Sequence, residues 1–258
     1  MTTKEELLSL KDVVVSVNNG NELRPILKKL NLTINAGDFI TILGTNGAGK
    51  TTLFNTIAGN LHPTSGQVLL RGQNIAQQNE EQRASFLARV FQDPKMGTAP
   101  RMTVAENLLL ATQRGQRRGL RLRKLRQNRD RFREMCAEMG NGLENHLDTP
   151  TGNLSGGQRQ ALSLLMATLT SPDILLLDEH TAALDPKTSE QLMQYTMERI
   201  NQNHLTCLMI THHLEDALKY GNRLVVIDDG RIEADYDAKQ KQTMTREKLY
   251  DFFDETIG

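Results

Sequence analysis

The sequence predicts an α/β fold with a mainly parallel sheet and an inserted helical segment. Short apolar stretches alternate with turn signals in the first part of the chain and return after residue 173, whereas residues 93–153 have helical character. Strands that alternate with helices form mainly parallel sheets covered on both faces. We therefore expect one domain over residues 1–258, with a core from 1–92 and 154–258 and a helical subdomain from 93–153.

Apolar stretches near the N-terminus, separated by turn signals such as Asn18-Asn19-Gly20, predict β-strands. These stretches are Leu8–Val17, Ile26–Ile34 and Gln67–Arg71. Phe39–Leu43 is a compact, partly β-branched run that ends at Gly44, which predicts a buried strand.

The middle of the chain changes to a helical pattern. Val104–Ala111 predicts a helix that Thr103 can cap, and Phe132, Met135 and Met139 follow at helical spacing. Apolar strands are predicted again further on, at Ile174–Leu177, Leu205–Thr211 and Arg223–Ile227.

The composition excludes several classes of protein. The 258 residues are 38% hydrophobic, which is enough to bury a core, but no apolar run approaches the ~18–20 residues that span a bilayer. The N-terminus shows no apolar signal region, so we expect a cytosolic protein. The formal net charge is zero, which gives no indication of nucleic-acid binding. Cys136 and Cys207 stand in dissimilar contexts and are expected to be reduced thiols.

Residues 44–51 match the phosphate-binding pattern G-x-x-x-x-G-K-[ST] in full. They are Gly44, Thr45, Asn46, Gly47, Ala48, Gly49, Lys50 and Thr51, with Thr52 directly after them. The glycines let successive N–H groups point at phosphate oxygens, at the start of a predicted helix. Lys50 supplies a cation and the Thr51 hydroxyl can bind Mg²⁺. This loop, the P-loop, predicts a P-loop NTPase core, without distinguishing transporters from kinases, GTPases or helicases.

The strand Ile174–Leu177 ends in two carboxylates, Asp178 and Glu179. A buried parallel strand delivers its last residues to the ligand edge of the sheet. Asp178 can there hold Mg²⁺ through water, and Glu179 can polarise an attacking water. An acidic pair after a strand is often only a solvated strand end, but downstream of a P-loop the catalytic interpretation is favoured.

The segment Leu154–Gln158 follows the pattern Leu-Ser-Gly-Gly-Gln, with Ser155 lying 23 positions before Asp178. Alone it could be a flexible turn that leads into a helix capped by Ser155. The spacing leaves room for one helix, Gln158–Leu169, and a turn. With the P-loop and the acidic strand, the chain resembles the ATP-binding-cassette (ABC) family over essentially its whole length.

The resemblance implies an antiparallel β subdomain at the N-terminus and a role for each matching residue. Gln92 would sense Mg²⁺ and contact a permease, Asp185 would communicate across a dimer, and His212 would contact the γ-phosphate. The segment Ser155, Gly156, Gly157 and Gln158 would close over the ATP held by a second copy of the chain. ATP and Mg²⁺ are the implied cofactors, sandwiched in a head-to-tail homodimer.

Two positions depart from the family pattern. His180 stands where the family usually has Pro, and Val17 stands where an aromatic residue usually stacks on adenine. Neither change touches the phosphate chemistry. Because Val17 offers only an aliphatic patch to the base, most of the binding energy must come from the phosphates and Mg²⁺.

Several segments resemble one narrower branch, the ATPases of bacterial uptake systems related to branched-chain amino acid importers. The companion binding proteins of these systems are generally assigned aromatic amino acids such as tryptophan. The segments are residues 91–100, 114–119, 155–168 and 178–188. An exporter remains an alternative. A soluble ABC ATPase of translation or DNA maintenance is less favoured, because the second cassette or long insertion typical of that class does not appear, and the intact Lys50, Asp178, Glu179 and His212 argue against a non-catalytic scaffold. The implied partners are integral permease subunits and, indirectly, an extracytoplasmic binding protein, with no nucleic acid. The implied location is the cytoplasmic face of the membrane.

Residues 114–133 contain ten Arg or Lys residues and one acid, Asp130. The segment is either a solvated helical face or a surface for lipid headgroups or acidic permease loops. Arg117, Arg118, Arg121 and Arg123 are the residues expected at such a surface.

Overall fold

The computed structural model describes residues 5–18, 20, 22–116 and 124–256, and its contacts divide the chain into two compact units. The first unit comprises residues 1–83 and 206–258, and the second comprises residues 84–205. The predicted helical subdomain, 93–153, lies inside the second unit together with two strands and two further helices. These strands and helices extend the second unit beyond the predicted boundaries because the insertion packs on them.

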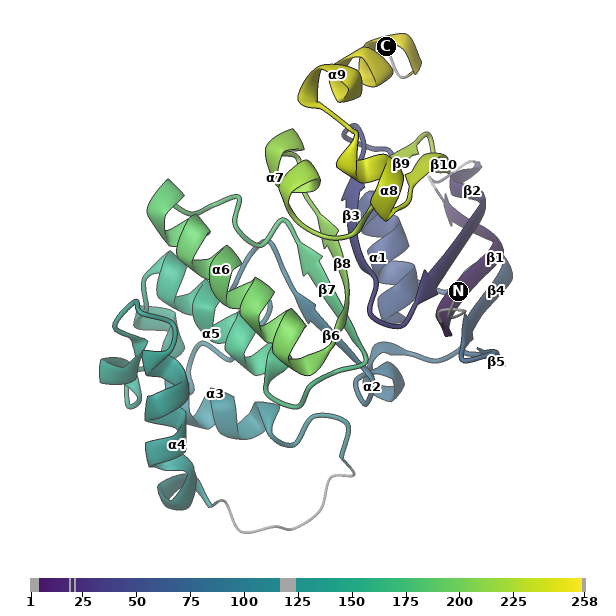
Figure 1. The fold of residues 1–258 in the computed structure, drawn as a ribbon. Coiled ribbons are helices and arrows are strands. Elements are labelled where there is room, and N and C mark those ends of the chain that lie inside the picture. The colour runs from purple at the N-terminus through teal and green to yellow at the C-terminus, as the bar shows by residue number, and fades with distance from the viewer. Residues whose placement is uncertain (1–4, 19, 21, 117–123, 257–258) are drawn as a thin grey trace. The chain divides into compact units, whose positions relative to one another are not determined.

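The first unit contains two sheets and five helices among its described residues (Figure 1). Its strands are β1 (Glu6–Asn18), β2 (Leu23–Asn35), β3 (Phe39–Leu43), β4 (Ser65–Leu70), β5 (Gln73–Asn74), β8 (Thr206–Ile210), β9 (Arg223–Asp228) and β10 (Arg231–Tyr236). Its helices are α1 (Lys50–Ala58), α2 (Glu80–Arg83), α7 (Leu214–Lys219), α8 (Ala238–Gln242) and α9 (Arg246–Thr256).

Strand order explains the hydrophobic patterns. β2, β1, β4 and β5 form an antiparallel sheet, as the resemblance implied. In the other sheet β3 lies between β9 and β8 and is parallel to both, while β10 pairs antiparallel with β9. Every residue of β3 is buried, and a strand covered on both faces needs such a continuous apolar run.

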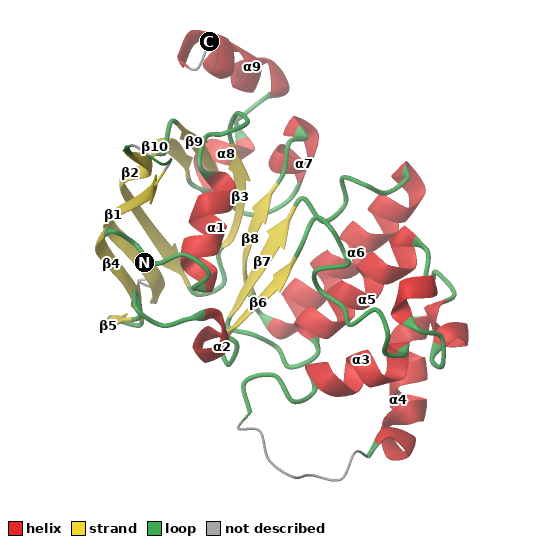
Figure 2. Ribbon diagram, turned by 180° about the vertical axis from the view of Figure 1, so that it is seen from behind, coloured by secondary structure: helices red, strands yellow, loops and turns green. Residues whose placement is uncertain are grey.

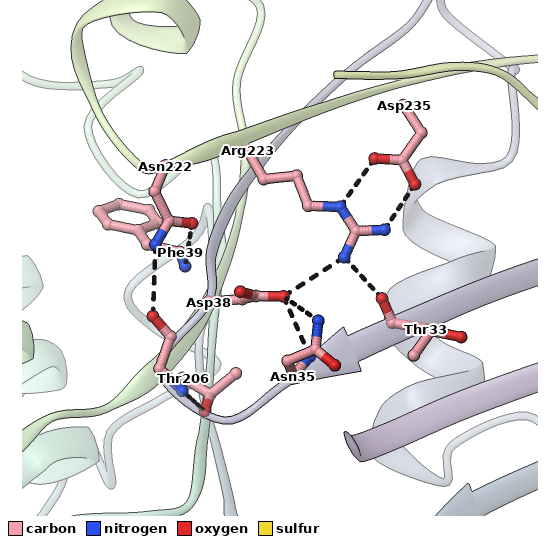
Figure 3. Close-up of polar contacts among 9 residues, drawn as sticks. Thr33, Asn35, Asp38, Phe39, Thr206, Asn222, Arg223 and Asp235 are labelled. Carbon is pink, nitrogen blue, oxygen red and sulfur yellow. Dashed lines mark hydrogen bonds and ion pairs between the residues drawn. The ribbon is translucent and has the colours of Figure 1, made fainter. Parts of the chain in front are cut away.

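A polar network ties the start of β3 to its neighbours in the first unit (Figure 3). Arg223 donates from Nε and Nη2 to the two carboxylate oxygens of Asp235, at 2.7 and 2.5 Å, and from Nη1 to the Thr33 carbonyl at 2.6 Å. Its Nη1 also lies 3.3 Å from Asp38, which is 2% exposed. This network fixes the end of β3 opposite the P-loop, so the strand has a defined register.

The second unit consists of a parallel strand pair and a group of helices, seen beside the strands in Figure 2. Its elements are β6 (Leu87–Val90), α3 (Val104–Ala111), α4 (Leu125–Ala137), the 3₁₀ turns Leu143–His146 and Thr151–Asn153, α5 (Gly156–Thr168), β7 (Ile174–Asp178) and α6 (Pro186–Asn203). The predicted cap is present: Thr103 accepts from the Glu106 N–H, and Glu106 reaches back to the Thr103 N–H. No helix in the described part of the chain has the length and apolar character that crossing a membrane requires.

Candidate functional site

The P-loop connects β3 to α1 in the first unit. A Cβ on Gly44 would lie 2.1 Å from the Ile227 carbonyl oxygen, so only glycine fits where the loop passes β9. Gly49 has φ 105°, a left-handed conformation that glycine adopts without steric cost. Thr45 Oγ1 donates to Asp228 Oδ1 at 2.8 Å, which holds the exposed part of the loop to the end of β9. The loop is therefore shaped by β9 as well as by its own glycines.

Lys50, the first residue of α1, places its charge inside this loop. Its ammonium donates to the carbonyls of Gly44 and Thr45 at 2.7 and 2.9 Å, and the residue is 6% exposed. The positive end of α1 and this ammonium lie together, an arrangement that binds phosphate oxygens. Thr51 and Thr52 follow in the first turn of α1, with Thr51 exposed.

The far end of α1 is held by a buried arginine. Arg83 donates from Nη1 to the carbonyls of Thr56 and Ile57, both at 2.7 Å, and from Nη2 to the Ile75 carbonyl at 2.5 Å. Burial lowers the pKa of the guanidinium to about 10, so it stays charged at neutral pH. Arg83 thereby satisfies carbonyls that the last turn of a helix leaves open.

In the second unit, Arg89 on β6 and Gln92, two residues after β6, contact the two carboxylates at the end of β7. Arg89 Nη2 lies 2.5 Å from Asp178 Oδ2, and both side chains are largely buried. Gln92 Nε2 donates to Glu179 Oε2 at 3.0 Å. The structure thus brings together the three residues Gln92, Asp178 and Glu179 that the sequence predicted, and it adds Arg89.

Glu179 has a constrained backbone. Its φ is 44°, in the left-handed region, which costs a residue with a side chain ~1–2 kcal/mol. The hydrogen bond from Gln92 fixes one carboxylate oxygen, and the side chain is half-buried. A carboxylate held in one orientation at a strand end can orient a water molecule.

His180, at the departure from the family pattern, is part of the core. It is 2% exposed, and its Nε2 lies 3.4 Å from Thr196 Oγ1 on α6. Burial lowers the pKa of His180 from 6.5 to about 4, so the imidazole is neutral at physiological pH.

We expect this histidine to make stability depend on pH. Between pH 6.5 and about 4 the unfolded chain binds more protons than the folded one, so the free energy of unfolding falls as pH is lowered through this window. The difference amounts to about 3 kcal/mol, from ~1.36 kcal/mol per pKa unit. Urea unfolding at pH 7 and pH 4.5 measures it, and His180→Gln should remove most of it. Thr196→Val keeps the buried imidazole and should retain it; an unchanged pH slope in His180→Gln would contradict the assignment.

The segment predicted to close over a partner's nucleotide forms the start of α5. Ser155 Oγ accepts from the Gln158 N–H at 3.2 Å, and Gln158 Oε1 accepts from the Ser155 N–H at 3.3 Å. Ser155 and Gly156 are exposed, and a Cβ on Gly156 would meet nothing within 4 Å. A Cβ on Gly157 would lie 2.9 Å from the Thr188 methyl on α6. Gly156 therefore faces open space, whereas Gly157 is required for packing of α5 on α6.

Three further predicted residues are exposed. Asp185 caps α6 by accepting from the Thr188 N–H at 3.1 Å, and hydrogen bonds from Thr188 lower the pKa of its carboxyl. His212 lies two residues after the end of β8, and because β8 is parallel to β3 it lies at the sheet edge where the P-loop begins. Val17 is 40% exposed near the end of β1.

The Arg-rich segment is only partly described, and the four residues expected to face lipid or permease, numbers 117, 118, 121 and 123, lie outside the described part. Arg114 has a structural role that the sequence did not predict. Its Nη2 donates to the Ala167 carbonyl and to Thr170 Oγ1, both at 2.7 Å, at the C-terminal end of α5. Burial lowers the pKa of Arg114.

Arg129, in the described part of the Arg-rich segment, pairs with Asp148. Cys136 and Cys207 are both buried free thiols.

Sequence reasoning did not identify Arg89 because the strand that carries it was not predicted. The signal available was a single arginine among the apolar residues Leu87, Ala88 and Val90, three positions before Gln92. The predicted site residues divide between the units: Val17, residues 44–52 and His212 belong to the first, and the others belong to the second.

Comparison with known proteins gives concordant matches. A sequence profile of the family described as ABC transporter matches residues 27–182. The chain is 41% identical over 253 residues to the tyrosine transport ATP-binding protein of Clostridioides difficile (strain R20291), covering 97% of this chain and 100% of that protein. It is 31% identical over 229 residues to the putative hemin import ATP-binding protein HrtA of Staphylococcus haemolyticus (strain JCSC1435), covering 88% and 99% respectively.

Solved structures give the same result. The ATP-binding cassette MJ0796, solved as a dimer in a post-hydrolysis state with ADP and Pi, matches with a TM-score of 0.76 and 27% identity. The match covers 90% of this chain and 99% of that one.

Proposed function

Because the chain belongs to the ABC transporter family, we propose that it is the ATP-hydrolysing subunit of an importer for an aromatic amino acid. It is an ATPase coupled to transport, which confirms the family, fold and enzyme class expected from the sequence. The observation that carries the importer and the substrate is the 41% identity to a tyrosine transport ATP-binding protein over that protein's full length. The residues that contact the transported substrate would lie in other polypeptides. The identity of the substrate is therefore inferred from sequence similarity alone.

The first unit would bind the nucleotide. Lys50 and the N–H groups of residues 44–52 would hold the β- and γ-phosphates, with the positive end of α1 behind them. Val17 would contact the adenine and His212 the γ-phosphate. The ammonium of Lys50, already inside the loop, supports this assignment.

Thr51, Gln92 and Asp178 would hold Mg²⁺. The end of β7 can bind a cation, because Asp178 Oδ2 already pairs with the Arg89 guanidinium at 2.5 Å. Mg²⁺ is commonly held by one or two carboxylates together with substrate phosphates. When bound, the ion would neutralise charge on the phosphate oxygens.

Glu179 would act as the base that orients the attacking water, since its carboxylate is positioned by Gln92. The γ-phosphate of one subunit would be closed by the start of α5 from a second copy, carrying Ser155, Gly156, Gly157 and Gln158, while Asp185 would communicate across the dimer. The exposure of Ser155 and Gly156 supports a role toward a partner. Closure and release of two copies would move integral permease subunits at the cytoplasmic face of the membrane, fed by an extracytoplasmic binding protein.

Uptake in cells tests this proposal. A strain that lacks the chain should accumulate ¹⁴C-tyrosine more slowly, and the unmodified chain should restore the initial rate whereas Lys50→Ala should not. Uptake of labelled leucine and of labelled hemin is measured in the same strains to test alternative substrates. Efflux from preloaded cells distinguishes an exporter. Normal tyrosine, tryptophan and phenylalanine uptake in the deletion strain, with loss of another substrate's uptake, would contradict the substrate assignment.

A further inference from the structure

Arg89 contacts the carboxylate of Asp178, the residue proposed above as a ligand of Mg²⁺. It lies on β6, which pairs parallel with β7, and its Nη2 is 2.5 Å from Asp178 Oδ2. The side chains of Arg89 and Asp178 are only 7% and 12% exposed, so water screens this pair weakly. Arg89 is thus a fixed cation at the end of β7.

The position of the guanidinium is restricted from a second side. Its Cζ lies 4.7 Å from the centre of the Phe91 ring, within the range of a cation–π contact. Ring and carboxylate together hold the planar group in place. The neighbouring carboxylate, Glu179, accepts a hydrogen bond from the uncharged amide of Gln92 at 3.0 Å and is more exposed than Asp178.

A guanidinium and a hydrated Mg²⁺ ion bind the same kind of oxygen atom. An ionised carboxylate offers about four lone-pair sites, and an arginine that occupies one oxygen both blocks it and repels a divalent cation. Resting on the proposed role of Asp178, we propose that Arg89 is a positioning residue that holds the Asp178 carboxylate before the metal binds and must release it as Mg²⁺–nucleotide binds. Arg89 therefore weakens the Mg²⁺ dependence of nucleotide binding.

The quantity to measure is metal linkage: the Kd of a fluorescent, non-hydrolysable nucleotide, mant-AMP-PNP, in EDTA divided by its Kd in saturating MgCl₂. Arg89→Met should raise this ratio by about tenfold, equivalent to ~1.4 kcal/mol. Arg89→Lys keeps the charge and should keep the ratio within about a factor of three of the unmodified protein, ~0.6 kcal/mol. A merely structural loss would lower affinity in both solutions and leave the ratio unchanged.

Two control variants test whether a change in the ratio is specific to the Arg89–Asp178 pair. Arg133→Met removes the same charge from an exposed pair with Asp130 on α4 and should leave the ratio unchanged. Asp178→Asn should lower the ratio. If Arg89→Met fails to fold by circular dichroism, Arg89→Gln keeps a donor without the charge and should change the ratio in the same direction.

The outcomes separate the two proposals. An unchanged or lower ratio in the folded Arg89 variant, with a lowered ratio in Asp178→Asn, overturns the role of Arg89 and leaves Asp178 as the metal ligand. An unchanged ratio in Asp178→Asn overturns the proposed metal position itself, and the inference about Arg89 with it.

Discussion

Glu179→Gln should bind ATP as tightly as the unmodified chain while hydrolysing it ~10²–10⁴-fold more slowly, the range expected when a general base is removed. The amide is nearly isosteric with the carboxylate and can still accept the hydrogen bond from Gln92. It cannot take a proton from water. Closure of two subunits around ATP would then lead to no product, so the variant should accumulate as an ATP-dependent dimer.

Single-turnover hydrolysis and size-exclusion chromatography with MgATP measure these two effects. Glu190→Gln is a matched control, because Glu190 is an exposed residue on α6 with the same change of charge. It should hydrolyse at the normal rate. A Glu179→Gln protein that turns over normally and remains monomeric would remove Glu179 from the role of base.

Ser155→Arg should abolish hydrolysis, by ~10²-fold or more, and leave the nucleotide affinity of the isolated subunit nearly intact. The side chain lies at the exposed start of α5, so its replacement blocks closure over a partner's nucleotide. Lys50→Ala should instead lose nucleotide affinity in its own subunit. Mixing the two inactive proteins should restore hydrolysis, since a heterodimer places both lesions in one composite site and leaves the other site whole.

The loss of the α5 cap must be separated from the block on closure. Replacing a serine cap costs ~1 kcal/mol, and Ser155→Ala suffers the same loss without the bulk of arginine. Equal thermal stability of the two variants, with a larger loss of hydrolysis in Ser155→Arg, isolates the steric block. Weakened ATP binding by monomeric Ser155→Arg, or no recovery on mixing, would contradict closure by a partner.

Local patterns made much of the fold predictable. Phe39–Leu43 and Ile174–Leu177 have the continuous apolar runs of strands buried on both faces, and Thr103 with Glu106 has the spacing of a capping box. The P-loop could be placed because glycine, lysine and threonine stand at fixed positions after a strand. In the capping box, and in the contacts of Lys50 with the carbonyls of Gly44 and Thr45, the interacting groups lie within six residues of one another, so the sequence contains the whole interaction.

Contacts between distant residues could not be predicted in the same way. Arg114 donates to carbonyls about fifty positions away, and Arg89 contacts a carboxylate 89 positions away. Arginines in a basic segment and in a short strand give no local sign of their partners. His180 was noticed as a departure from a pattern, but its burial against Thr196 depends on the packing of α6 on β7.

Hydrogen bonds from side chains satisfy backbone groups at both ends of α5. Ser155 and Gln158 form a capping box at its start, and Arg114 donates to the Ala167 carbonyl at its other end. Midway along the first turns, Gln160 Nε2 donates to the Phe91 carbonyl at 3.0 Å, immediately before Gln92. Helix ends fray more readily where their terminal N–H and C=O groups lack partners. We therefore expect α5 to remain ordered to both ends, which keeps the exposed residues Ser155 and Gly156 in place at its start.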